Sequence, residues 1–195
     1  MKFTEERLEA SFVELLDNEG YLNQHGDTIA RNLDDVLIKD DLRSFLLKQY
    51  EQDGITINEV NSIILQLKSL SSSDLYESNK RFNKMLSDGF ILRRENHKQK
   101  DIYIQLIDYS GLDKYFTPDE DNLISIVAEE DEVYYKDNNI YKFVNQLEIL
   151  GQEKRIPDGI IYINGLPLIV FEFKSTIREE ATIFDAFKQL TIRYR

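Results

Sequence analysis

Residues 156–175 read IPDGIIYINGLPLIVFEFKS, and the dipeptide Asn164-Gly165 near their centre is the strongest local constraint on the fold. Asn-Gly between two apolar runs is typical of a two-residue β-hairpin turn, because both residues tolerate positive φ. The second run, LIVFEFK at 168–174, is apolar without a break until Glu172, which predicts a central strand covered on both faces. The segment therefore predicts an antiparallel hairpin inside a sheet.

The periodicity of the chain changes once, near residue 90. Helical periodicity and capping signals predict helices over 4–17, 32–50, 57–70, 75–87 and from about 178. Period-two patterns predict strands within 89–94, 101–109, 122–130, 132–136 and 141–150, before the hairpin. Helices, then strands, then a helix predict a mixed α/β fold with α+β-like order, in which helices flank a central sheet.

The 195 residues fit a single domain. We expect a helical portion over about 1–88 and a sheet-forming core over about 89–195 that packs with the helix at 4–17. The last residues, FKQLTIRYR, carry a helical pattern without a stop signal, so a fragment of a longer chain is expected. No run resembles a signal peptide or membrane span, and there is no Cys, so we expect a cytoplasmic protein without disulfide or thiolate chemistry.

The net charge of −12 argues against a wholly basic protein that coats nucleic acid. The distribution is uneven, since window 79–100 holds seven Lys or Arg against two Asp or Glu, whereas 128–133 is strongly acidic. Either run is typical of a solvated helix or loop face. Contact of the 79–100 window with phosphate is the alternative, because such contacts need only one basic face.

Three charged residues interrupt the apolar hairpin: Asp158, Glu172 and Lys174. Side chains alternate along a strand, so Glu172 and Lys174 share one face while Phe171 and Phe173 share the other. Simple pairing about the Asn-Gly turn places residue 158 near residue 171. A bulge or a splayed strand end would bring Asp158 closer to Glu172.

Two carboxylates that converge in a partly dry site repel each other and favour a hard cation such as Mg²⁺. Asp158 and Glu172 are therefore candidate metal ligands, and Lys174 is a candidate to orient or deprotonate an attacking water. This pattern predicts metal-assisted hydrolysis of a phosphodiester. The alternative is a structural salt bridge between Lys174 and either carboxylate, the usual role of a Glu-x-Lys pair on a strand.

The spacing of Pro157-Asp158 and Glu172-x-Lys174 resembles the PD-(D/E)xK nuclease pattern. With the flanking words VNQLEI, NGLPL and AFKQLTIRYR, the block resembles the N-terminal nuclease domain of the R subunit of type I restriction–modification enzymes. The words TEERLEASFVELLDNEGY and LYESNKRFNKMLSDGF also resemble that family. The resemblance therefore spans nearly the whole chain and is densest over 142–195.

This resemblance implies a restriction-endonuclease-like core that cuts both strands of unmodified DNA with Mg²⁺. It implies that the main-chain carbonyl of Phe173 helps Asp158 and Glu172 to hold the ion. In this family an acidic residue of the first helix often completes the site, and Glu9, or else Glu5, is the candidate.

The family's Gln-Tyr element, normally QxxxY, corresponds to Gln189 and Tyr194, here with one extra residue between them. The resemblance implies that these two residues contact DNA. It also implies an R subunit that continues into an ATP-dependent translocase and assembles with modification and specificity subunits. ATP would then bind only in the motor region, which these residues do not contain.

Two other functions stay open: a non-catalytic DNA-binding or subunit-docking module on a nuclease-like fold, and a self-sufficient nuclease. His25 and His97 are the only histidines and form no zinc motif. His25 lies in NQHGD after the first helix, where it would approach the site, but a structural or surface role is expected for both.

Overall fold

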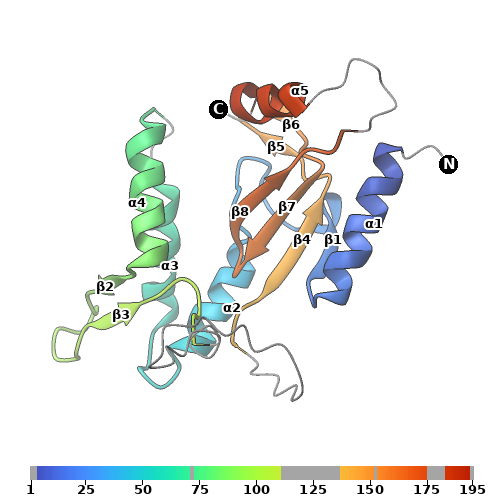
Figure 1. Cartoon of the computed structure of the whole chain (residues 1–195). Coiled ribbons are helices and arrows are strands. Elements are labelled where there is room, and N and C mark those ends of the chain that lie inside the picture. Colours follow the sequence, from blue (N-terminus) through green and yellow to red (C-terminus); the bar gives the residue numbers. More distant parts are fainter. Residues whose placement is uncertain (1–3, 71–72, 111–136, 152, 175–182, 194–195) are drawn as a thin grey trace, which may run out of the picture. The chain divides into compact units, whose positions relative to one another are not determined.

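The computed structural model describes residues 4–70, 73–110, 137–151, 153–174 and 183–193. The chain divides into two compact units, one of residues 1–42 with 140–195 and the other of residues 43–139. The first unit contains a four-stranded mixed sheet, and the second contains helices with a two-stranded sheet (Figure 1). The predicted mixed α/β class is confirmed. The strands expected within 122–130 and 132–136 lie outside the described residues.

The sheet of the first unit has the strand order β1-β4-β7-β8. Its strands are β1 (Leu22–His25), β4 (Tyr141–Asn145), β7 (Gly159–Ile163) and β8 (Leu166–Phe171). β1 runs parallel to β4, and the other neighbours are antiparallel. The sequence LNQH of β1 carries no strand signal, so its pairing with β4 makes this segment a strand. A hairpin of β5 (Ile149–Leu150) and β6 (Lys154–Arg155) lies between β4 and β7 in the chain.

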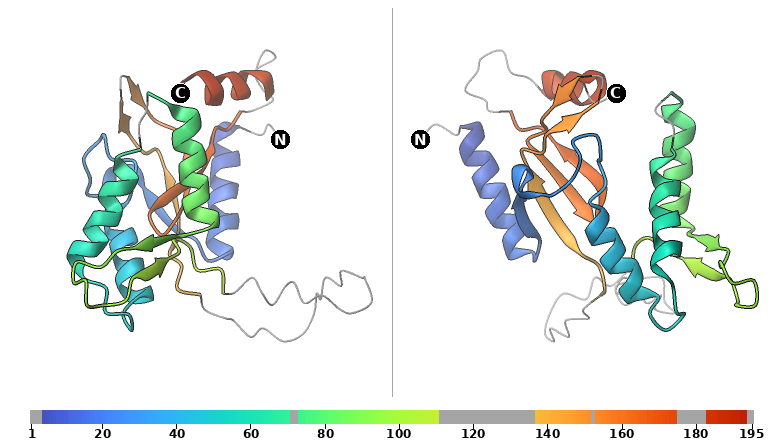
Figure 2. Two further views of the ribbon diagram at one scale, coloured as in Figure 1. Left: turned by 90° about the vertical axis from the view of Figure 1, so that its left-hand side faces the viewer. Right: turned by 180° about the vertical axis from the view of Figure 1, so that it is seen from behind.

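Helix α1 (Glu5–Asn18) covers one face of this sheet (Figure 2). As predicted, Thr4 caps the helix, since its hydroxyl oxygen accepts a hydrogen bond from the Arg7 N–H at 3.3 Å. The Phe12 ring packs against Phe143 and Phe171, with ring centroids 5.6 and 4.7 Å apart. Gly20, at φ +84°, follows the helix as the predicted stop. The predicted packing of this helix on the sheet is therefore present.

The segment before α2 (Lys39–Gln49) packs on the opposite face, where Val144, Ile160 and Tyr162 cluster with Ile38. The helix predicted from residue 32 is wrong over 32–38, which contain turns and bends. The Val36 carbonyl accepts a hydrogen bond from the Tyr162 hydroxyl at 3.0 Å, and the Ile38 N–H donates to the Gly165 carbonyl at 3.0 Å. These tertiary bonds occupy backbone groups that a helix would have paired internally.

The Asn-Gly turn between β7 and β8 is formed as predicted, with φ of +53° at Asn164 and +74° at Gly165. The buried Asn164 side chain accepts a hydrogen bond from the Ile140 N–H at 2.8 Å. A methyl group at position 165 would overlap the carbonyl oxygen of Ile38. Gly165 therefore satisfies two requirements, a positive φ and close approach of another backbone.

We expect Gly165→Ala to destabilise the protein by at least about 2 kcal/mol, because backbone strain and overlap with Ile38 act together. Gly20→Ala is the matched control, since Gly20 also has positive φ but nothing lies within 4 Å of the added methyl group. Thermal unfolding followed by circular dichroism measures both. Equal losses in melting temperature for the two variants would contradict the tight contact at Gly165.

β8 differs from the central strand that its apolar run predicts. It lies at the edge of the sheet in the described part of the chain, and Ile169 and Val170 are 49% and 39% exposed. It also ends at Phe171, so Glu172 and Lys174 follow the strand instead of lying within it. An apolar run alone does not reveal how many neighbours a strand has, and here only β7 pairs with β8 among these residues.

The second unit contains α3 (Ile57–Lys68) and α4 (Leu75–Ser87), both close to their predicted bounds. β2 (Phe90–Leu92) and β3 (Ile102–Ile104) form an antiparallel pair, shorter than the predicted strands. Apolar side chains of α3, such as Val60 and Ile63, are fully buried. In the parts of the chain that the structure describes, no helix is long and apolar enough to cross a membrane.

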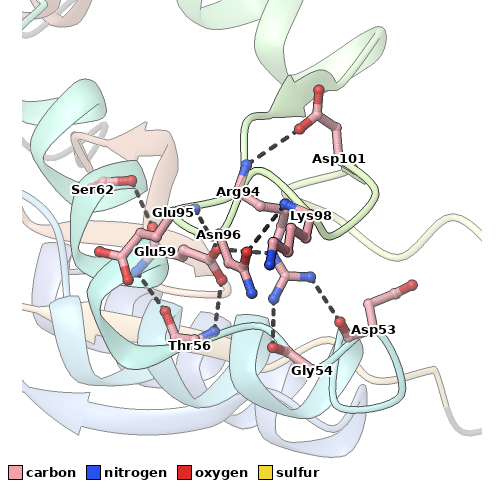
Figure 3. A network of polar contacts seen from close by, with 10 residues as sticks. All are labelled: Asp53, Gly54, Thr56, Glu59, Ser62, Arg94, Glu95, Asn96, Lys98 and Asp101. Carbon is pink, nitrogen blue, oxygen red and sulfur yellow. Dashed lines mark hydrogen bonds and ion pairs between the residues drawn. The ribbon is translucent and has the colours of Figure 1, made fainter.

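A buried ion pair of Glu59 and Arg94 joins α3 to the chain after β2 (Figure 3). Arg94 Nε donates to Glu59 Oε1 at 2.8 Å, and its terminal nitrogens donate to the carbonyls of Asp53 and Gly54 at 2.9 and 2.7 Å. Glu59 also accepts from the Thr56 N–H at 2.9 Å in a capping box. Burial raises the pKa of Glu59, but its hydrogen bonds and Arg94 outweigh this and lower the pKa overall. The pair is therefore charged and well satisfied.

Candidate active site

One end of the four-stranded sheet gathers most of the candidate site residues. His25, Asn145, Gly159 and Phe171 form one row of paired residues across the four strands. Asp158 immediately precedes Gly159, and Glu172 immediately follows Phe171. The two carboxylates therefore extend beyond the last paired row, at the same end of the sheet.

A β-bulge in β8 sets the register of these two residues. Ile161 pairs with Ile169, but Tyr162 pairs with Pro167, so Leu168 is an extra residue in β8. Gly159 then pairs with Phe171, and the next position places residue 158 opposite residue 172. Opposite residues on paired strands share a face, so the bulge puts both carboxylates on one side of the sheet. Without it, Asp158 would lie opposite Phe171.

The site is held by short polar contacts. Asp158 Oδ2 accepts a hydrogen bond from the Phe173 N–H at 2.6 Å. Lys174 Nζ donates to Glu172 Oε1 at 2.8 Å, and the Glu172 side chain is only 4% exposed against 26% for Lys174. On the other face, Phe173 packs against Phe12, with ring centroids 5.4 Å apart. The expected separation of the charged and aromatic faces is therefore present.

The charge of Asp158 is disfavoured where it lies. Burial raises the pKa of its carboxyl group, and Glu172 and Glu9 add to this effect. The Phe173 N–H and the Lys174 ammonium group lower the pKa, but the overall direction is upward. A bound cation would favour the ionised form of this carboxyl group, because it offsets the repulsion from the second acid.

Glu9 contacts this end of the sheet from α1. Its Oε1 accepts a hydrogen bond from Asn145 Nδ2 at 3.3 Å, which orients the carboxylate. Glu5 lies one helical turn earlier, and its part in the site stays a prediction. Sequence reasoning missed Asn145, for which the only signal is its place at the end of β4.

Within the described residues, no group of three or more acidic, histidine or cysteine side chains is close enough to hold a metal ion by itself. Mg²⁺ does not need such a group, since it commonly binds through one or two carboxylates and keeps waters or phosphate oxygens. Asp158 and Glu172 supply two hard oxygen donors, and burial together with Glu172 and Glu9 raises the pKa of the Asp158 carboxyl group. The donor set therefore fits Mg²⁺ bound with a phosphate.

The remaining site predictions are less well defined by the structure. A π-helical turn (η2, Gln189–Arg193) follows α5 (Ile183–Lys188), but the Gln189 side chain and all of Tyr194 lie outside the described residues, as does 178–182.

His25 ends β1 in the site row and contacts Asp27, with Nδ1 and Oδ1 2.7 Å apart. It is half exposed beside a cavity of about 520 Å³. His97 is exposed in the β2–β3 loop.

A mixed sheet with paired carboxylates at one end is typical of the α/β nuclease-like class. Residues 2–195 match the family model described as the type I restriction enzyme R protein N terminus, so the chain belongs to this family. The predicted resemblance to the N-terminal domain of the type I restriction enzyme R subunit is thereby confirmed.

Two curated relatives illustrate the match. The chain is 31% identical over 169 residues to the type I restriction enzyme HindI endonuclease subunit of Haemophilus influenzae, covering 85% of the chain and 14% of the relative. It is 27% identical over 188 residues to a putative type I restriction enzyme MjaIXP endonuclease subunit of Methanocaldococcus jannaschii, covering 92% and 16%. The chain thus spans only 14–16% of the length of these relatives. No solved structure matches it.

Proposed function

We propose that this domain is a metal-dependent endonuclease that hydrolyses phosphodiester bonds in both strands of unmodified DNA. The observation that carries the proposal is the convergence of Asp158, Glu172 and Lys174 at one end of the sheet. Family membership supports it, since the relatives are named as endonuclease subunits. A structural salt bridge would account for Glu172 and Lys174, but not for the position of Asp158, whose pKa is raised by burial and by the neighbouring Glu172 and Glu9.

Each group has a proposed role in the reaction. Asp158, Glu172 and the Phe173 carbonyl would hold Mg²⁺, which when bound acts as a Lewis acid and makes a water more acidic. The Phe173 N–H fixes the Asp158 carboxylate, and Glu9, oriented by Asn145, borders the same site. Lys174, held by Glu172, orients the attacking water and stabilises negative charge on the phosphate oxygens.

We further propose the setting of this reaction. Membership of the type I restriction enzyme R protein family implies a multi-subunit complex. In the longer subunit, cleavage would be coupled to ATP-dependent translocation by a motor region, and modification and specificity subunits would complete the assembly. A cytoplasmic location follows from this role, because the DNA substrate lies there.

Calorimetric titration of the 195-residue chain with Mg²⁺ and Mn²⁺ tests the metal site directly. We expect Glu172→Gln and Asp158→Asn each to weaken metal binding by at least about tenfold. Loss of an outer-shell partner alone typically costs about tenfold or more in metal affinity, and these two residues are proposed as direct ligands. Glu9→Gln is expected to have a smaller effect, because the residue contacts the site through Asn145. Glu14→Gln, on the exposed side of α1, is the matched control.

The outcome also separates the two classes of function. Metal binding that is unaffected by both Asp158→Asn and Glu172→Gln would exclude the proposed site. It would favour instead a non-catalytic DNA-binding or docking module on the same fold.

A further inference from the structure

The exposed face of α4 gathers basic side chains in the second unit. Lys80 and Lys84 are four residues apart, so they lie one above the other on the helix, and Tyr76 precedes them at the same spacing. This face is opposite Met85, which is buried, and Tyr76 and the Lys80 side chain are 74% and 64% exposed. Arg81 is also exposed, but it lies one turn before Met85, on the flank of the helix. We call Tyr76, Lys80 and Lys84 the α4 basic face.

The local charge stands out in an acidic chain. Residues 80–87, KRFNKMLS, contain three basic residues and no acidic one, although the chain carries a net charge of −12. Glu77 contacts Lys80 at 3.5 Å, but both side chains are more than half exposed, so this pair contributes little. Lys84 lies in the last turn, where the helix dipole favours it. The dipole does not account for Lys80 and Arg81, which lie nearer the middle of the helix.

The structure also distinguishes this face from Arg94, another basic residue of the window 79–100. Arg94 is buried against Glu59, so it is not available to a partner. The α4 basic face is held in place at the end of the helix, where the Tyr103 hydroxyl donates to the Asp88 carbonyl and the Tyr109 hydroxyl to the Leu86 carbonyl. The lysines therefore project from an anchored helix.

We propose that the α4 basic face binds the phosphate backbone of double-stranded DNA. Lys and Arg supply most phosphate contacts, and Tyr, Asn and Ser side chains supply others. The same stretch of α4 offers an exposed Asn83 beside the lysines, a mixture suited to phosphate oxygens. Such contacts position a protein on DNA without reading its sequence. The choice of DNA as the polymer rests on the proposed function.

Fluorescence anisotropy with a labelled DNA duplex of mixed sequence tests this proposal. The measurement uses the 195-residue chain in EDTA, so that the carboxylate site makes no contribution through metal. We expect Lys80→Glu with Lys84→Glu to weaken binding by at least about tenfold and to reduce the salt slope by about 2, because two phosphate contacts are lost. The loss should be the same for duplexes of different sequence.

The matched control reverses the same charge elsewhere in the unit, at Lys48 and Lys68, which are exposed. This double variant should retain most of the affinity, and circular dichroism verifies that both variants are folded. Unchanged DNA binding and salt slope in the Lys80/Lys84 variant would overturn the proposal, as would absence of DNA binding by the unmodified chain. Labelled polyglutamate that binds as tightly as DNA, with the same loss, would identify an acidic protein as the partner instead.

The two proposals fail separately. Glu14→Gln, outside the site, should leave DNA binding in EDTA unchanged, whereas Asp158→Asn is expected to remove cleavage. If Asp158→Asn leaves cleavage intact while the Lys80/Lys84 variant loses DNA binding, the proposed catalytic site is wrong and the DNA-binding face stands.

Discussion

Replacement of Asp158 by alanine is expected to reduce DNA cleavage by about 1,000-fold or more in an R subunit that carries this domain, because loss of a metal ligand removes several kcal/mol of transition-state stabilisation. The variant leaves the Phe173 N–H without its acceptor and removes one of the two carboxylates proposed to bind the metal. Cleavage of supercoiled DNA in the assembled enzyme, with ATP and Mg²⁺, is the measurement. Under the proposed function, translocation should continue, since the proposed motor region lies outside these residues.

Controls separate loss of chemistry from loss of folding. Glu172→Gln, nearly isosteric with the native residue, should reduce cleavage to a similar degree with little change in melting temperature. Glu14→Gln removes an exposed carboxylate and should cut normally. If Asp158→Ala and Glu172→Gln both cleave at the native rate, the carboxylates are not catalytic and the salt-bridge interpretation holds.

Replacement of Arg94 by methionine is expected to destabilise the second unit by about 3–5 kcal/mol, the usual cost of leaving one member of a buried ion pair without its partner. Glu59 would keep its backbone hydrogen bonds but lose the arginine cation that pairs with it, and the carbonyls of Asp53 and Gly54 would lose their donors. Thermal unfolding and hydrogen exchange of α3 amides would measure the loss.

A second variant identifies charge as the cause. Arg94→Met combined with Glu59→Gln should recover part of the stability, because glutamine retains the capping interaction with Thr56 without a buried charge. Arg93→Met, at the exposed neighbouring position, should change stability by less than about 0.5 kcal/mol. If the double variant is less stable than Arg94→Met alone, the loss is due to packing and not to the unpaired charge.

Local signals predicted the elements whose ends are set by nearby residues. Thr4 and Gly20 bound α1 as expected, and Asn164-Gly165 forms the turn, because caps and positive-φ turns depend on a few neighbouring backbone groups. The helix expected from residue 32 was wrong for the opposite reason. Residues 32–38 have helical periodicity, but their backbone forms hydrogen bonds with β7 and the Asn164-Gly165 turn instead of helical ones. β7 and the turn lie more than 100 residues away in sequence.

In the basic window 79–100, too, the sequence and the tertiary structure determine different features. Its charge was evident from the sequence, but burial distinguishes Arg94, which stabilises α3, from Lys80 and Lys84, which face solvent. The signal for the buried partner was present in the capping box Thr56-x-x-Glu59. No local pattern pairs that glutamate with an arginine 35 residues later, because such pairing arises only when the chain packs.

The sequence by itself determined which residues are chemically able to form the candidate site: two carboxylates and a lysine on either side of a hairpin. Tertiary structure decided that they meet, because the one-residue bulge at Leu168 shifts the register and places Asp158 opposite Glu172 instead of Phe171. Side chains alternate with a period of two, so this single residue transfers a carboxylate from one face of the sheet to the other. Only the pairing of whole strands could select that register.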